Sequence, residues 1–207
     1  MNSASLDPRP AMVDLCRTIY DRQLSDSAGG NVSVRLEGKI YVSPRFMGSK
    51  HRWQITPEMI SVLDAETRQV IEGPQELSRE VKAHLALYQA FPDAGSVIHA
   101  HPCYVQVFTS LNKPLPPMTE YTRKYGTIPC IPPAKAHSQE LADDVVAVLA
   151  PKRNEFVGHG LAVLLPYHGI ICLGHDMDEA YDTLERMEVN ARCAIFGAFL
   201  RLAEDKA

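Results

Sequence analysis

The sequence of 207 residues predicts an α/β protein, a three-layer sandwich in which a central mixed or antiparallel sheet lies between two layers of helices. Two observations support this prediction. Pairs of apolar segments joined by short turns are typical of antiparallel hairpins, and segments with helical periodicity lie between those pairs. The length and the 45% apolar content fit one hydrophobic core, so a single domain over residues 1–207 is expected.

The first third of the chain combines one helix with short strands. Met12, Leu15, Cys16 and Ile19 recur at helical spacing, which predicts a helix over residues 11–24. The segments that follow alternate between polar and apolar residues and are separated by turn residues. Four strands are therefore expected, at residues 31–35, 39–42, 59–63 and 69–71.

The middle of the chain predicts a helix, a strand and a second helix. Ser78 is a candidate N-cap for a helix over residues 78–90, whose buried stripe would contain Val81, Leu85 and Tyr88. An apolar strand is expected at 96–100, and Pro102 is suited to the first turn of the helix that follows.

The last third predicts two helices and a hairpin. Ser138 is a candidate N-cap for a helix over 138–150, and Asp176 lies at the start of a long amphipathic helix that ends at Arg201. Three strands are expected, at residues 127–131, 160–165 and 169–173.

Composition excludes several classes of function. A net charge of −4 argues against a general nucleic-acid surface, and no apolar run approaches the roughly 18 residues that span a bilayer. Residues 1–10 contain no apolar core of a signal peptide. The five cysteines are odd in number and scattered, which favours reduced thiols in the cytoplasm.

Two histidines separated by one residue lie at the end of the apolar strand expected at 96–100. Side chains alternate along a strand, so His99 and His101 are expected to point to the same side. Two imidazoles on one side can chelate a divalent metal, which would indicate Lewis-acid chemistry. The pair alone is equally compatible with two unrelated histidines at the end of a strand.

A third histidine and a carboxylate are candidates for the same site. His168 precedes Gly169 in the turn of the last hairpin and would complete a site of three nitrogens with one open coordination position. It could instead be an ordinary turn residue. Glu80 lies in the first turn of its helix, where it is either a charge stabilised by the helix dipole or a general base beside the metal.

The remaining histidines have weaker claims on a function. His84 lies one turn after Glu80 and is expected to pack or hydrogen-bond within the helix layer. The other four fall in loops, where exposure is the default: His51, His137, His159 and His175.

Four motifs follow one another along the chain: Gly29-Gly30-Asn31-Val32-Ser33-Val34-Arg35, Ser78-Arg79-Glu80 followed by His84-Leu85-Ala86-Leu87-Tyr88, His99-Ala100-His101-Pro102 and Tyr167-His168-Gly169. In this order they resemble the class II aldolase/adducin family, whose best-known enzyme is L-fuculose-phosphate aldolase, and the resemblance extends over about residues 11–201. It implies a class II aldolase-like fold and a homotetramer with sites at subunit interfaces.

The resemblance also implies roles for individual residues. His99, His101 and His168 would hold Zn²⁺ or another divalent ion such as Mn²⁺, Co²⁺ or Fe²⁺. Glu80 would be the acid/base beside the substrate carbonyl, with the metal stabilising an enediolate. Tyr121 falls where the aldolase has a tyrosine that protonates the aldehyde oxygen, and Tyr125 is the alternative.

The substrate pocket departs from the family pattern of an Asn, a Thr-Gly pair and two serines. Asn31 and Ser78 match, but Arg45-Phe46 occupies the Thr-Gly position unless that position has shifted to Gly48-Ser49. Arg79 replaces the second serine. An arginine grips a phosphate or a carboxylate in bidentate geometry, and either arginine could also be an exposed charge.

A further departure is that no tyrosine follows Tyr181, so a tail tyrosine that would complete a neighbour's site is missing. Some decarboxylases related to this family resemble this chain in having a basic residue beside the first serine.

The main functional expectation is a metal-dependent lyase of carbohydrate metabolism that cleaves a C–C bond of a sugar phosphate by a retro-aldol reaction. The first alternative is a decarboxylase of a phosphorylated or unphosphorylated keto acid. An epimerase or dehydratase on the same scaffold is a further alternative. A non-catalytic adducin-like interaction module is least expected, because such modules need no metal set and this chain has the three histidines and Glu80.

Overall fold

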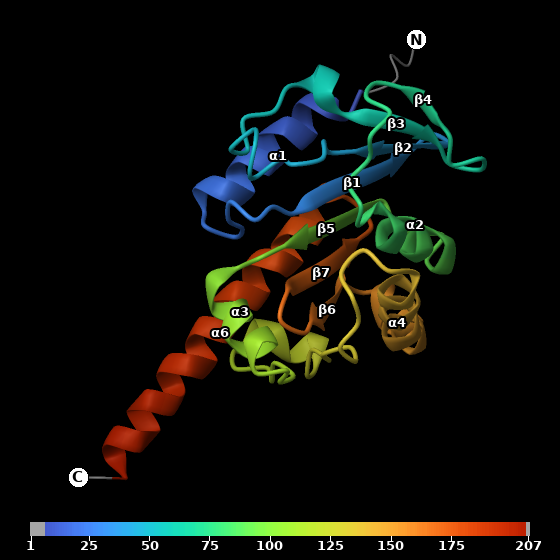
Figure 1. The fold of residues 1–207 in the computed structure, drawn as a ribbon. Coiled ribbons are helices and arrows are strands. Elements are labelled where there is room, and N and C mark those ends of the chain that lie inside the picture. The colour runs from blue at the N-terminus through green and yellow to red at the C-terminus, as the bar shows by residue number, and fades with distance from the viewer. Residues whose placement is uncertain (1–6, 206–207) are drawn as a thin grey trace, which may run out of the picture.

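The computed structural model describes residues 7–205 and contains a seven-stranded sheet in the order β4-β3-β2-β1-β5-β7-β6 (Figure 1). Every pairing between these strands is antiparallel. The strands are β1 (Asn31–Leu36), β2 (Lys39–Val42), β3 (Ser61–Asp64), β4 (Val70–Glu72), β5 (Ser96–Ala100), β6 (Leu161–Leu165) and β7 (Gly169–Gly174). The hairpin architecture expected from the alternating apolar segments is confirmed, with an antiparallel sheet.

Helices cover both faces of the sheet and make three layers, as expected (Figure 1). One face carries α1 (Arg9–Asp21), α3 (Cys103–Ser110) and α6 (Met177–Glu204), and the other carries α2 (Val81–Ala90) and α4 (Gln139–Leu149). The shorter elements are α5 (Arg153–Phe156) and the 3₁₀ helices η1 (Pro57–Met59), η2 (Glu120–Tyr125) and η3 (Ala150–Lys152). No helix within residues 7–205 is long and apolar enough to cross a membrane.

Alternate residues of the central strands belong to two separate hydrophobic cores, one on each face of the sheet. In β7, Ile170 and Cys172 pack in the core beneath α1, α3 and α6, whereas Ile171 and Leu173 pack in the core beneath α2 and α4. Both faces are buried, so a strand such as β7 has no polar face, which is why it forms a continuous apolar run in the sequence.

The expected domain of residues 1–207 includes 1–6 and 206–207, which lie outside the described residues.

Several expected boundaries shift by a few residues. The first helix begins and ends earlier than expected, at Arg9 and Asp21, and Met59 belongs to a 3₁₀ helix rather than to β3. The predicted cap of α4 is confirmed, because Ser138 accepts a hydrogen bond from the Leu141 amide. Asp176 lies at the start of α6 as expected, and the structure shows that it caps this helix by accepting a hydrogen bond from the Glu179 amide.

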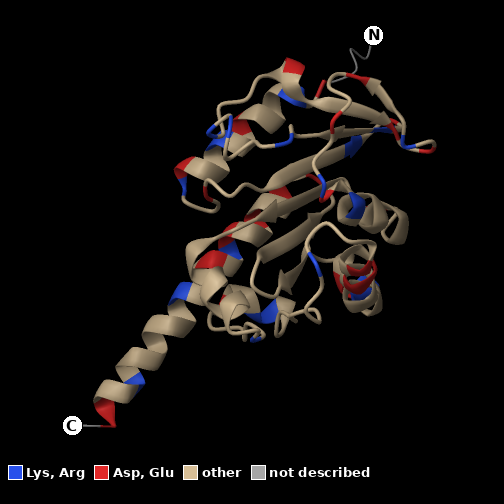
Figure 2. Ribbon diagram, viewed as in Figure 1, with Lys and Arg blue, Asp and Glu red and all other residues tan. Residues whose placement is uncertain are grey.

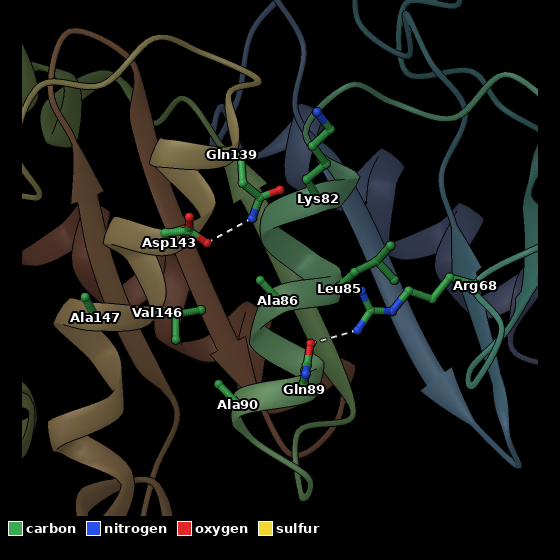
Figure 3. Close-up of a pocket in the computed structure, with 10 residues that line it drawn as sticks. All are labelled: Arg68, Lys82, Leu85, Ala86, Gln89, Ala90, Gln139, Asp143, Val146 and Ala147. Carbon is green, nitrogen blue, oxygen red and sulfur yellow. Dashed lines mark hydrogen bonds between the residues drawn. The ribbon is translucent and has the colours of Figure 1, made fainter.

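Two predictions about α2 are wrong. Ser78 is not its N-cap, because the helix begins at Val81 and Glu80 occupies the cap position. The Ser78 hydroxyl instead contacts the Asn31 side chain at 3.2 Å. Leu85 is not in the buried stripe. Leu85 is half-buried: it packs against the core beneath α2 and α4 and lines an open groove of about 590 Å³ between these helices (Figure 3). Val81 and Tyr88 are buried as expected.

The strand predicted at 127–131 is also absent. Ile128 pairs with Leu115 and Cys130 pairs with Leu164, each as a single isolated bridge. Pro129 lies between them and has no amide hydrogen to donate, so a continuous ladder cannot form.

The C-terminal half of α6 extends beyond the sheet and projects away from the rest of the chain (Figure 1). Few of its residues are charged (Figure 2). Four large apolar side chains are exposed along it: Phe196, Phe199, Leu200 and Leu202.

Candidate metal centre and active site

The sheet brings His99, His101 and His168 together from two distant segments. His99 lies in β5, His101 follows it, and His168 immediately precedes β7, the strand that pairs with β5. The three ring centroids are 4.7 to 5.2 Å apart. The nitrogens that could bind an ion all lie within 4.8 Å of one another.

Gly169 permits this close approach. A Cβ atom at residue 169 would lie 2.3 Å from the Ala100 carbonyl oxygen and 2.7 Å from Cδ2 of His101. Any larger residue would therefore push the two strand ends apart.

Two of the rings are oriented through their Nδ1 atoms. Nδ1 of His99 donates to the Ile170 carbonyl oxygen at 3.0 Å, because a carbonyl can only accept. Nδ1 of His101 lies 3.1 Å from Oδ1 of Asp26. The Nε2 atoms of His99 and His101 consequently face each other at 3.1 Å. Nitrogens about 2.0–2.1 Å from a tetrahedral ion are about 3.4 Å apart, so this pair fits zinc-like coordination.

Glu80 lies against the histidines. Its carboxylate oxygens are 3.2 Å from Nε2 of His99 and 3.1 Å from Nε2 of His168. Asn31 donates to the same carboxylate at 2.9 Å. The Glu80 side chain is only 12% exposed. The site therefore combines three imidazoles with a largely buried carboxylate, which is a set suited to holding a divalent cation beside a base.

Burial affects the charge state of the two closest groups. It lowers the pKa of His99 to about 3, although the nearby Glu80 opposes that shift, so the His99 imidazole is neutral at pH 7, as a metal ligand must be. Burial alone would raise the pKa of Glu80. The hydrogen bonds from His168 and Asn31 act in the opposite direction, and the Glu80 pKa is lowered.

A polar pocket of about 90 Å³ adjoins this centre and contains the four predicted substrate-binding residues, Asn31, Arg45, Ser78 and Arg79. Phe46 and Ser49 also line it, so both segments considered for the Thr-Gly position reach the pocket. The other lining residues are Ala28, Gly29, Gly30, Met47, Glu80 and His137.

Arg45 has an unsatisfied donor at this pocket. Its Nη1 donates to Glu76 at 3.2 Å, and its guanidinium lies over the Phe46 ring. Its Nε is buried and has no partner among the described residues. Buried donors are normally paired, so this donor is available to an acceptor atom of a molecule bound in the pocket.

The two candidate tyrosines occupy different environments. Tyr121 is 47% exposed in η2, and its ring lies 5.4 Å from the Arg186 guanidinium. Tyr125 is 3% exposed and packs against His159, and burial raises its pKa. Neither is among the described residues that line the pocket beside the histidines, and Tyr121 is the one that another molecule could reach.

Sequence reasoning missed two residues at the site. His137, expected on the surface, lines the pocket, and its Nδ1 lies 3.5 Å from Oε1 of Glu80. Asp26 supports His101 and was not singled out. Both lie in loops far from the histidines in the sequence, so spacing gave no signal for either.

Of the other histidines, His84 packs within the helix layer as expected, with Nδ1 2.7 Å from the Ser33 hydroxyl. The expectation of a surface location for His159 is wrong, because it is buried against Tyr125.

Comparison with known proteins agrees with this architecture. The Class II Aldolase and Adducin N-terminal domain matches residues 10–195. A 3-oxo-tetronate 4-phosphate decarboxylase of Haemophilus influenzae is 29% identical over 90% of this chain and 86% of its own length. An L-fuculose phosphate aldolase of Methanocaldococcus jannaschii is 28% identical, with coverages of 91% and 96%.

Solved structures show the same fold. An L-fuculose 1-phosphate aldolase superposes with a TM-score of 0.78 at 26% identity, covering 95% of this chain and 89% of the other. The fold of the L-fuculose-1-phosphate aldolase from Thermus thermophilus also matches, with a TM-score of 0.78, 21% identity and coverages of 95% and 97%. The chain belongs to the class II aldolase and adducin family, as its motifs indicated.

Proposed function

We propose that this protein is a metal-dependent lyase that cleaves a C–C bond of a sugar phosphate by a retro-aldol reaction. The contact of Glu80 with Nε2 of both His99 and His168, at 3.2 and 3.1 Å, carries the proposal. An ordinary charge at the start of a helix points to solvent, whereas this carboxylate lies among three candidate ligands. The names of the aldolase relatives support the same reaction class.

His99, His101 and His168 would hold the cation, for which Zn²⁺ is the first choice and Mn²⁺, Co²⁺ or Fe²⁺ the alternatives. When bound, a divalent cation would act as a Lewis acid and polarise the substrate carbonyl.

The surrounding side chains would bind the substrate and move its protons. Asn31, Ser78, Arg45 and Arg79 line one pocket and would hold its phosphate group, with the free Nε of Arg45 as one donor. The Glu80 carboxylate would exchange a proton with the substrate carbon next to the carbonyl. Tyr121, exposed in η2, is the proposed donor to the aldehyde oxygen of a substrate bound by a neighbouring subunit.

Decarboxylation of a phosphorylated keto acid is the second candidate. The observation that favours it is the pair of arginines at one pocket, since Arg79 stands directly beside Ser78 and Arg45 faces the same space. Two guanidinium groups suit a substrate that carries both a phosphate and a carboxylate. One relative of similar identity is named as a decarboxylase of such a phosphate.

A substrate panel tests both candidates. Sugar phosphates and phosphorylated keto acids are incubated with the metal-loaded protein, and aldehyde release and carbon dioxide release are followed in parallel. Aldehyde release from a sugar phosphate supports the lyase, and carbon dioxide from a keto acid supports the second candidate. Neither product from any substrate, in protein that retains its metal, would refute both.

The assembly that we propose is a homotetramer. Its support is the exposed apolar surface of Phe196, Phe199, Leu200 and Leu202 on the projecting end of α6 (Figures 1 and 2). Light scattering measures the mass directly, and a monomer at micromolar concentration would contradict the proposal.

All five cysteines are free thiols, which supports a cytoplasmic location.

A further inference from the structure

The three candidate ligands are supported in three different ways. Nδ1 of His99 is held by a main-chain carbonyl, that of Ile170, which no substitution can remove. Nδ1 of His168 is buried and has no partner among residues 7–205. Among the three, His101 is the one whose Nδ1 contacts another side chain, the carboxylate of Asp26 at 3.1 Å.

Asp26 is itself held firmly. Its Oδ1 accepts a hydrogen bond from the Ala28 amide at 2.9 Å, and its main-chain oxygen accepts one from Nε1 of Trp53 at 2.8 Å. A Cβ atom at Gly48 would lie 2.9 Å from that same oxygen, so the segment is enclosed from behind as well. These contacts fix the main chain of Asp26, and the loop therefore directs its carboxylate toward His101.

The same loop contacts the His101 main chain. The Ser25 hydroxyl accepts a hydrogen bond from the His101 amide at 3.2 Å and donates to the Gly29 carbonyl at 2.6 Å. Both the backbone and the ring of His101 therefore rest on residues 25–29. The loop continues into Ala28 and Gly29, which line the substrate pocket.

We propose that Asp26 is a positioning residue for the cation, acting through His101. This inference rests on the proposed function, because it requires that the three histidines bind a metal. The carboxylate accepts the Nδ1 proton of His101, which leaves the Nε2 lone pair directed at the site and makes the imidazole a stronger donor. The Asp26 side chain is 46% exposed, so its charge remains hydrated and has little burial cost.

Metal affinity tests the proposal without reference to turnover. Zn²⁺ affinity is measured by competition with a chromophoric chelator for the wild type and for Asp26→Ala, Asp26→Asn and Asp143→Asn. Asp143 lies on α4 in the outer groove and is the control for loss of one carboxylate charge (Figure 3). Asp26→Ala should weaken binding about 10–100-fold, as outer partners of metal-binding histidines do. Asp26→Asn keeps an acceptor without the charge and should lie between.

Two spectra separate positioning from loss of structure. Trp53 is the only tryptophan and bonds to Asp26, so its emission reports whether the loop is intact. The visible spectrum of the Co²⁺-loaded protein reports the ligand geometry, and Asp26→Ala should change it while the Asp143→Asn spectrum stays as in the wild type. If Asp26→Ala loses the native Trp53 emission, the Zn²⁺ affinity of the isosteric variant Asp26→Asn tests the proposal instead.

The outcomes are distinct. Wild-type Zn²⁺ affinity in Asp26→Asn and Asp26→Ala would overturn the role of Asp26, as would an equal loss in Asp143→Asn. Failure of the proposed function looks different: the wild type would bind no Zn²⁺, or His99→Ala would bind it as tightly as the wild type.

Discussion

Asn31 donates from Nδ2 to Oε2 of Glu80 over 2.9 Å, and its partner in the β1–β5 ladder is His99. The sheet register therefore places a neutral amide against the carboxylate that also contacts His99 and His168. The Oδ1 atom of Asn31 is buried without a described partner, on the side chain that lines the pocket. One residue thus links the candidate base to the substrate pocket.

Replacement of Asn31 with Ala should reduce kcat/KM and leave the metal bound. A hydrogen bond to a charged group contributes about 1.5–3 kcal/mol, which corresponds to roughly a 10- to 150-fold loss. Steady-state kinetics and metal analysis on the same preparation measure the two effects. An unchanged kcat/KM would show that Glu80 needs no help from the amide.

Glu80→Gln should retain the metal and lose proton exchange at the substrate carbon. Glutamine is isosteric but cannot take up the proton, and general acid–base groups contribute about 10²–10⁴-fold. NMR of a three-carbon ketone phosphate in D₂O follows the exchange directly. Exchange at the wild-type rate would mean that another group is the base.

Arg79→Ser should shift preference toward ligands like fuculose phosphate. The change removes a guanidinium from the pocket and restores the serine pair of the family pattern. Relative kcat/KM values for a sugar phosphate and a phosphorylated keto acid measure the shift. Arg68→Ser, in the outer groove between α2 and α4, is the matched control. If both variants rank the substrates as the wild type does, Arg79 is a surface charge.

His137→Asn should leave the stability of the fold nearly unchanged and impair the reaction. His137 has a φ of +68°, in the left-handed region where His and Asn are both enriched, so the free energy of unfolding should change little. The imidazole that lies 3.5 Å from Glu80 is lost, and kcat/KM should fall. Urea unfolding and kinetics are compared at one protein concentration. A variant that is both less stable and fully active would contradict each half of this prediction.

The buried His84 should make the metal-free protein less stable in mild acid. Burial lowers the pKa of His84 from 6.5 to about 4, so the unfolded chain takes up a proton at a pH where the folded protein does not. The stabilisation is complete above about pH 6.5 and is lost as pH falls toward 4, by roughly 3 kcal/mol in total.

Urea midpoints between pH 7 and 4 for the wild type and His84→Gln isolate this contribution, because the other titrating groups are common to both. The stability curve of the variant should be flatter over that interval. Parallel curves would assign the acid sensitivity to other groups.

Local patterns were sufficient for much of the fold. The β1–β2 hairpin was predicted closely because its alternation and its turn are contained within a dozen residues. The strand expected at 127–131 failed because Pro129 interrupts a ladder whose partners, Leu115 and Leu164, belong to other parts of the chain. The Ser78 cap failed because the helix begins at Val81, with Glu80 at the cap position, and the Ser78 hydroxyl accepts from Asn31, 47 residues away in sequence.

In the candidate site too, local features were predicted and contacts between distant segments were not. The three histidines were recognisable because the strand and turn that carry them are local features. His137 and Asp26 were not, since each acquires its neighbour only when a loop folds over the sheet edge. A loop histidine or aspartate has no periodicity, so no spacing rule could distinguish these two from ordinary surface residues.

The antiparallel ladder through β1, β5 and β7 pairs Asn31 with His99 and His99 with Ile171. A slip of one residue in either pairing would turn the imidazole to the opposite face. Arg45, Arg79 and His137 stand outside that ladder, on connecting segments. New substrate preferences can thus be engineered by grafting these connections, while the ladder through β1, β5 and β7 keeps His99 in its place.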